Sequence, residues 1–127
     1  MSYKKIRSYK DLIVWKQGHK LVLEVYALTR TFPKEELYSL TDQMKRSAIS
    51  ITSNIAEGFS RKSSKEKSQF YYISLGSITE LENQLLIAKD LRYLNNKDFK
   101  NLAEKLTSVH KLLNRLISTT RSKFVSP

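Results

Sequence analysis

The stretch FKNLAEKLTSVHKLLNRL, residues 99–116, decides the fold of this chain. Its apolar residues recur at alternating gaps of three and four, and they are Phe99, Leu102, Leu106, Val109, Leu113 and Leu116. A half-buried strand alternates every second residue, whereas this spacing is the seam of a helix that packs along a bundle axis. Asn96 is a favourable N-cap and Asp98 suits a first turn, so the sequence predicts a helix over residues 97–121.

A first helix is predicted over residues 9–30. Two neighbouring apolar stripes run along it, which makes its apolar face wider than one packing seam needs. Ser8 and Asp11 resemble a capping box at its start, and Phe32 and Pro33 end it. The leftover apolar width indicates that something outside the lone bundle covers this helix.

Two more helices are predicted over residues 40–60 and 64–93, the second opened by a capping box of Ser63 and Glu66. Connections this short place consecutive helices antiparallel, which gives up-down-up-down topology. With only 3 Gly and 2 Pro the chain has few helix breakers, and we find no linker or repeat. We expect one all-α domain over residues 1–127, an antiparallel four-helix bundle with short basic tails.

Residues for catalysis or metal binding are scarce. The chain has no Cys, and neither His19 nor His110 has a carboxylate or a second His at metal-ligand spacing. The glycines stand singly and no serine lies in a nucleophile elbow. We therefore expect no enzymatic activity, no metal and no cofactor. The longest apolar runs are four residues, so we expect no membrane span and place the protein in the reducing cytoplasm.

The predicted helix over residues 40–60 is unusual because small and polar residues fill its second half. Ser, Thr and Asn compete for backbone hydrogen bonds, so this helix needs tertiary support. Polar residues share one of its faces, at Arg46, Ser50, Asn54, Glu57 and Arg61. We interpret this face as a polar seam between closely approaching helices, in which Asn54 and Glu57 bind neighbouring side chains or backbone. A ligand or catalytic patch is the alternative. Gly76 in the next helix supports close approach, because mid-helix Gly costs roughly 1 kcal/mol relative to Ala.

The run Ser50-Ile51-Thr52-Ser53-Asn54-Ile55-Ala56-Glu57-Gly58 resembles the signature of a family of four-helix bundle proteins. These are the proteins encoded in intervening sequences of bacterial 23S rRNA genes. Further matches are Leu12 to Trp15, Phe32-Pro33, Leu40-Thr41-Asp42-Gln43, and Gly76-Ser77 with Glu80-Leu81-Glu82. The resemblance extends from about Tyr9 to Leu116.

The resemblance implies a small helical bundle that assembles into a ring, commonly a homopentamer. It also implies kinship with the accessory proteins of diversity-generating retroelements, which bind nucleic acid and a reverse transcriptase. No enzymatic activity is implied. On this resemblance the structural signature residues are Ser50, Ser53, Asn54, Glu57 and Gly58.

The predicted topology concentrates the net charge of +11. Residues 1–11, 57–67 and 115–127 share one end of an up-down bundle, and Lys and Arg there outnumber Asp and Glu by 11 to 3. Lys65 and Lys67 oppose the dipole of the helix they begin, so this end is either a solvated basic surface or a surface that contacts phosphates. The predicted phosphate-contacting residues are Lys4, Lys5, Arg7, Lys10, Arg61, Lys62, Lys65, Lys67, Arg115, Arg121 and Lys123.

Three functions are consistent with this pattern. The first is a non-enzymatic homo-oligomer whose basic end binds RNA or DNA without sequence specificity. The second is a scaffolding module that recruits a protein partner and has no nucleic-acid role. The third, against our expectation, is an enzyme that uses Asn54 and Glu57 with Arg46 or Arg61.

Overall fold

Four α-helices follow one another in the computed structural model of the chain, which describes residues 5–122. They are α1 (Ile13–Thr29), α2 (Leu40–Ser60), α3 (Ser64–Asp90) and α4 (Asn96–Arg121). Two 3₁₀ turns, η1 (Tyr9–Asp11) and η2 (Lys34–Glu36), precede α1 and α2, and none of the residues in the described range is in a strand. The predicted all-α class with four helices is confirmed.

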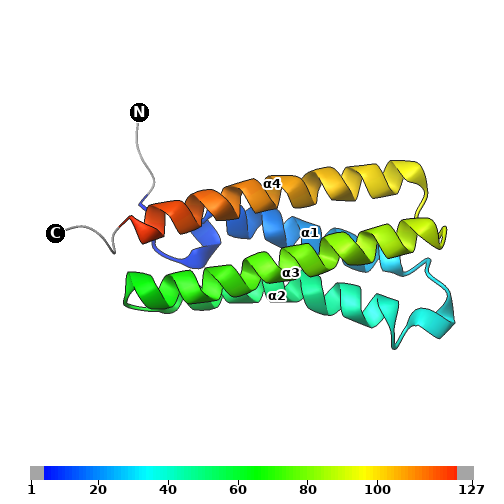
Figure 1. The fold of residues 1–127 in the computed structure, drawn as a ribbon, viewed down its shortest axis with the longest axis horizontal. Helices are drawn as coiled ribbons and strands as arrows, with labels where there is room; N and C mark the ends of the chain where they lie inside the picture. The colour runs from blue at the N-terminus through cyan, green and yellow to red at the C-terminus, as the bar shows by residue number, and fades with distance from the viewer. Residues whose placement is uncertain (1–4, 123–127) are drawn as a thin grey trace.

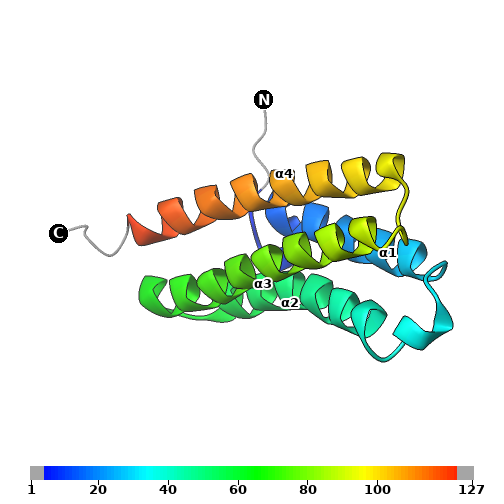
Figure 2. The ribbon, with the colours of Figure 1, turned by 45° about the vertical axis from the view of Figure 1, so that its right-hand side comes forward.

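The helices lie side by side along one long axis, and each runs opposite to the one before it (Figures 1 and 2). Each helix contacts its neighbour in the sequence, and α4 also contacts α1. An ion pair between Lys105 and Glu24 joins α4 to α1. Helices α1 and α3 make no such contact with each other within the described chain, so they occupy diagonal corners of the bundle.

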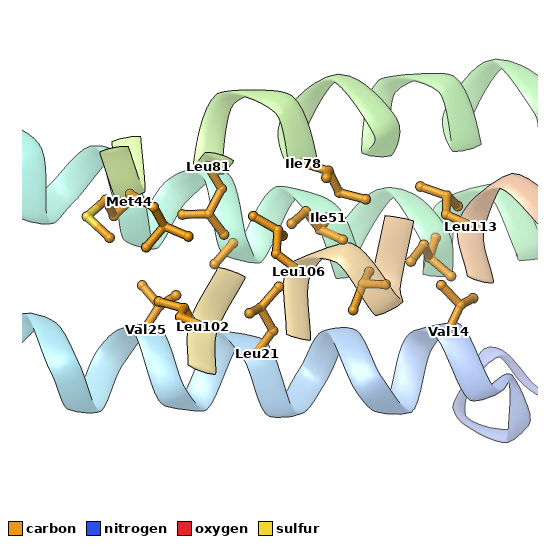
Figure 3. Packing of buried hydrophobic residues seen from close by; sticks show 14 of the residues in the cluster. Val14, Leu21, Val25, Met44, Ile51, Ile78, Leu81, Leu102, Leu106 and Leu113 are labelled. Atoms are coloured by element: carbon orange, nitrogen blue, oxygen red, sulfur yellow. The ribbon is translucent and has the colours of Figure 1, made fainter. Parts of the chain in front are cut away.

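Apolar side chains from all four helices meet in the core (Figure 3). Leu21, Ile51, Ile78 and Leu113 are fully buried, one from each helix. Burial of a Leu or Ile side chain contributes about 1.5–3 kcal/mol relative to exposure, so each of these residues stabilises the fold. The predicted apolar line of α4 is buried along its middle, while Phe99 and Leu116 at its two ends are partly buried.

The predicted start of the first helix is wrong. Residues Tyr9–Asp11 form the 3₁₀ turn η1, the backbone is extended at Leu12, and α1 begins only at Ile13. The expected capping box exists, but it caps the turn: the Asp11 carboxylate accepts from the Ser8 N–H at 3.2 Å. Leu12 is buried, so the extended backbone that places its side chain in the core prevails over one continuous helix.

Helix α3 ends at Asp90, three residues before the predicted end. Arg92 has a φ of 66°, its N–H donates to the Lys89 carbonyl, and the Tyr93 N–H donates to the Ala88 carbonyl, both at 2.9 Å. This pair of bonds is a Schellman motif, whose left-handed position is usually Gly. Because the left-handed residue is Arg and not Gly, the sequence gives no signal for the end of α3, and the predicted end of the helix comes too late.

Helix α4 begins one residue before the predicted start. Its N-cap is Asn95 rather than Asn96, because the Asn95 Oδ1 accepts from the Asp98 N–H at 2.7 Å. Helix α2 has the predicted bounds.

Small polar residues form the contact between α2 and α3. The Ser74 hydroxyl donates to the Ile51 carbonyl, and the Ser77 hydroxyl donates to that of Ser50, each at 2.7 Å. These bonds join the two helices directly, because Ser side chains are short enough to allow close backbone approach. A polar seam is therefore present, as the composition of α2 indicates.

Gly18 and Gly58 permit close packing between helices, whereas Gly76 does not. A Cβ on Gly58 would lie 2.6 Å from Cε1 of Tyr71, and one on Gly18 would lie 2.9 Å from Cγ2 of Thr52. A Cβ on Gly76 would meet nothing within 4 Å, so the predicted tight contact at Gly76 is wrong. Tyr71 fills the space that Gly58 leaves, and burial raises the pKa of Tyr71 to about 12.

Candidate nucleic-acid interface at the basic end

The turn between α2 and α3 lies at the same end of the bundle as the start of the described chain and the end of α4 (Figure 1). Six of the predicted basic residues at this end have exposed side chains. Within the described range these six side chains make no hydrogen bond or ion pair. They are Lys5, Arg7, Lys10, Lys62, Lys65 and Arg115. We call them the free basic cluster. Lys4 and Lys123 lie outside the described residues.

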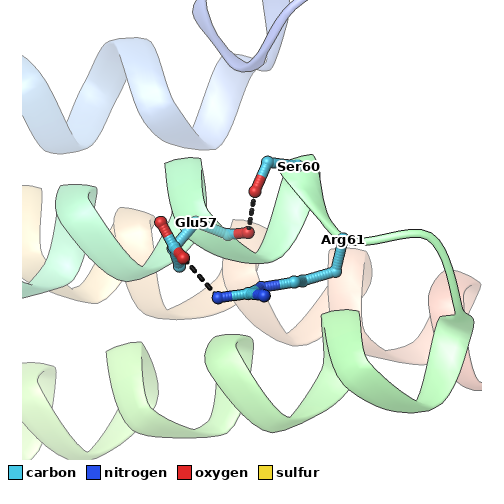
Figure 4. Close-up of polar contacts among 3 residues, drawn as sticks. All are labelled: Glu57, Ser60 and Arg61. Atoms are coloured by element: carbon cyan, nitrogen blue, oxygen red, sulfur yellow. Dashed lines mark hydrogen bonds and ion pairs between the residues drawn. The ribbon is translucent and has the colours of Figure 1, made fainter.

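Arg61 is held by its own surroundings. Its Nη2 lies 2.5 Å from Oε1 of Glu57, one helical turn away (Figure 4). The guanidinium also stacks over the Phe70 ring, 4.6 Å from the ring centroid. The Ser60 hydroxyl donates to the Glu57 carbonyl at 2.6 Å, so this corner of the turn is internally bonded. Arg61 contributes charge to the end, and its bond to Glu57 and its contact with Phe70 fix the orientation of the guanidinium.

Lys67 closes the end of α2. Its ammonium donates to the Phe59 carbonyl at 2.6 Å and lies 5.1 Å from the centroid of the Phe59 ring. Carbonyls in the last turn of a helix lack partners within the helix, and a cation satisfies them well. This bond explains a Lys at an unfavourable position in the first turn of α3 without a nucleic-acid contact.

Arg121 is one of the residues that line a shallow hollow between α3 and α4. Its Nη1 donates to the Tyr72 hydroxyl at 2.7 Å, which joins the end of α4 to α3. The hollow has a volume of about 560 Å³, and its lining residues are Tyr72, Asn114, Ile117, Ser118, Arg121 and Ser122. Arg121 remains exposed, so it can contact an anion without giving up a buried partner.

Of the signature residues of α2, Asn54 and Glu57 bind partners on α2 and its C-cap. The Asn54 amide donates to the Ser50 carbonyl at 2.8 Å and to the Ser50 hydroxyl at 3.0 Å. Glu57 binds Arg61, and Gly58 packs against Tyr71, while Ser53 is exposed. The seam to α3 is thus made by Ser50 and Gly58, and Asn54 and Glu57 do not reach across it.

The residues of the alternative catalytic patch do not converge on one point. Arg46 binds Asp42 at 2.9 Å, Asn54 binds Ser50, and Arg61 binds Glu57, each across four residues of α2. Elsewhere in residues 5–122 no group of three His, Asp or Glu side chains is placed to hold a metal ion. None of the described helices is long and apolar enough to cross a membrane.

Aromatic partners of the cations were not predicted. Phe59 and Phe70 lie within ten residues of Lys67 and Arg61 across one turn, so pairing aromatic with basic residues across the predicted turn would have found them. Tyr72 is 49 positions from Arg121, and only the register of α3 against α4 brings the two together.

These features define a class: a small all-helical bundle protein with one strongly cationic end. The chain belongs to the 23S rRNA-intervening sequence protein family, whose model matches residues 10–115.

Comparison with solved structures supports the fold. The chain is similar to a protein of unknown function from the S23 ribosomal protein family of Bacteroides thetaiotaomicron, with a TM-score of 0.77 and 21% identity. The alignment covers 83% of this chain and 98% of that one. No curated protein matches the sequence.

Proposed function

We propose that this chain is a non-enzymatic, self-associating helical-bundle protein that binds nucleic acid through its basic end. Binding is sequence-independent, because exposed Lys and Arg side chains contact phosphates rather than base edges. We place this activity in the cytoplasm, which the absence of cysteine fits.

The observation that carries the proposal is the free basic cluster. Its residues belong to three separate parts of the chain that meet at one end of the bundle (Figure 1), and all of them are exposed. Like charges repel, so such a group raises the free energy of the bundle unless a polyanion neutralises it. RNA is the polyanion to test first, because the description of the family names 23S rRNA.

The test is a salt titration of RNA binding, with a labelled RNA hairpin and a labelled single strand as probes. Affinity is expected to fall linearly on a log–log plot as salt rises. The double variant Lys62→Glu with Lys65→Glu is expected to bind both probes more weakly and to lower the magnitude of the slope by about two, one for each lost phosphate contact.

The matched control is Lys97→Glu with Lys100→Glu. These exposed lysines lie in the first two turns of α4 at the opposite end, and the change in net charge is the same. If the end of the bundle matters, the control retains most of the affinity. Equal losses in both double variants, or no binding at low salt, would refute the proposal.

The scaffolding function remains the second candidate, because large apolar side chains are exposed on α3. It predicts a co-purifying protein and no response of that complex to the Lys62 and Lys65 changes. Sedimentation with and without RNA at two salt concentrations measures self-association and RNA binding in one experiment, so each part of the proposal can fail separately.

A further inference from the structure

Exposed large apolar residues are more numerous on α3 than on α1, whose predicted wide apolar face is partly covered within the bundle. Trp15 of α1 is covered by stacking on His19 and by the edge of Tyr9, at ring-centroid distances of 4.9 and 5.3 Å. On α3 and its C-cap five large apolar residues are exposed by 41–53%, namely Tyr72, Ile73, Leu86, Ile87 and Leu91. These residues form two groups, one at residues 72–73 and one at residues 86–91, which a partner helix packed along α3 can cover together.

One line of exposed residues on α3 has the spacing of a packing seam. Gaps of three and four separate Ile73, Gly76, Glu80, Asn83 and Ile87, which we call the α3 outer face. Gly76 lies in its middle with open space around it, so a neighbouring helix can approach the backbone there. Within the bundle alone, nothing offsets the roughly 1 kcal/mol that this Gly costs relative to Ala.

The charge of this region differs from that of the rest of the chain. No Lys or Arg occurs from Ser68 to Ala88, although the whole sequence has 23 of them. Lys is depleted in the buried centres of protein interfaces because its ammonium is costly to desolvate. The charged residue of the α3 outer face is Glu80, so a complementary surface carries positive charge.

Such a surface exists on α1. Exposed residues with the same gaps of three and four form the α1 outer face, namely Ile13, Lys16, Lys20, Leu23 and Ala27. Ile13 and Leu23 are 63% and 58% exposed, and Lys16 and Lys20 form no ion pair with any described residue. This face is apolar and basic where the α3 outer face is apolar and acidic.

We propose that the α1 outer face of one copy packs against the α3 outer face of the next. The inference rests on the self-association proposed above and assigns its interface. Helices α1 and α3 occupy diagonal corners of the bundle. A copy whose α1 outer face is bound to a neighbour therefore still has its α3 outer face available for another copy. Two α3 outer faces packed together would oppose Glu80 to Glu80, so the arrangement is head-to-tail. A head-to-tail interface builds a ring if it closes and a filament if it does not.

The test uses one variant for each face and sedimentation equilibrium of the full chain. Ile73→Glu disables the α3 outer face and Leu23→Glu disables the α1 outer face, and both positions are exposed, so folding is retained. Each variant alone is expected to sediment at the subunit mass. Mixed in equal amounts they are expected to give twice that mass, because one intact α1 face then meets one intact α3 face.

The matched control is Leu37→Glu, at an apolar position that is 47% exposed and outside both faces. It is expected to keep the mass of the wild type. The interface assignment is overturned if either face variant keeps the wild-type mass, or if the mixture stays at the subunit mass. A monomeric wild type would refute self-association itself, and the RNA titration would then decide the remaining function separately.

Discussion

The ammonium of Lys67 donates to the carbonyl oxygen of Phe59 at 2.6 Å, across the turn between α2 and α3. Both residues lie at the basic end, yet this bond serves the fold. A Lys that the charge pattern assigns to phosphate binding satisfies the end of α2 instead. Neighbouring Lys62 and Lys65 have no such partner within the described residues, so under the proposed function stability and binding are assigned to different lysines that are close in sequence.

Lys67→Met is expected to lower the free energy of unfolding by about 1 kcal/mol, because it removes a charge-assisted hydrogen bond and keeps the length of the side chain. RNA affinity should change little. Lys62→Met is the control. Its free energy of unfolding should stay within about 0.5 kcal/mol of the wild type, and its RNA affinity should fall. Urea unfolding and the RNA titration measure both quantities. Loss of RNA binding without loss of stability in Lys67→Met would contradict this division.

Gly58→Ala and Gly76→Ala are expected to change stability in opposite directions. The new methyl group at residue 58 would lie 2.6 Å from the Tyr71 ring and 3.1 Å from the Lys67 carbonyl, so we expect a loss of about 1–3 kcal/mol. At residue 76 it meets open space, and the better helix propensity of Ala should add about 0.5–1 kcal/mol. Urea unfolding at several protein concentrations separates these effects from self-association. Two losses of similar size would show that Gly76 is packed.

The spacing of apolar residues predicts much of this fold, because which face of a helix is buried follows from the local sequence pattern. The buried lines through Ile51, Ile78 and Leu106 follow directly from it. Gly76 could also have been placed correctly, since it lies two positions before Ile78 and so faces away from the buried line. The extended backbone at Leu12 could not have been predicted. It depends on the space that the packed helices leave for the Leu12 side chain, and no local pattern encodes that space.

The candidate site was harder to predict than the fold. Charge placement at one end needs only the topology, and for that reason the free basic cluster was found. Which lysines and arginines are occupied depends on single contacts, such as Arg61 with Phe70 and Arg121 with Tyr72. The apolar face of α3 was missed because Tyr72 and Ile73 adjoin the buried Tyr71, and spacing alone assigns them to one apolar run.

Arg92→Gly is expected to stabilise the chain by about 0.5–1 kcal/mol. Arg92 is a non-glycine residue with a positive φ, at the left-handed position of the Schellman motif, where its Cβ crowds the following carbonyl. Gly removes that cost but gains entropy in the unfolded chain, so the net gain is smaller than the strain. Thermal unfolding should show a higher Tm. Arg30→Gly is the control at a C-cap with ordinary right-handed backbone, and it should lower the Tm.

At the end opposite the basic cluster, the Tyr93 hydroxyl donates to Oε2 of Glu36 at 2.8 Å and the Ser39 hydroxyl donates to Oε1 at 2.6 Å. These bonds hold η2, before α2, against the turn that follows α3. The bond from Ser39, and then the bond from Tyr93, lower the pKa of Glu36 below its ordinary value of 4.5. The bond to Glu36 and burial raise the pKa of Tyr93 above 10.0.

The sign of each shift gives the pH dependence. Glu36 has a lowered pKa, so its contribution is present above the unfolded value of 4.5 and is lost as pH falls through the folded pKa. Tyr93 has a raised pKa, so its contribution is present below 10.0 and is lost as pH rises through the folded pKa. Tyr93→Phe should therefore lower Tm most between these values, and the difference from wild type should shrink at both extremes. Tyr38→Phe, at a side chain that is 91% exposed, is the control and should not change Tm at any pH. A Tm difference for Tyr93→Phe that stays constant from acid to alkaline pH would show that the ring, and not its hydrogen bond to Glu36, stabilises this end.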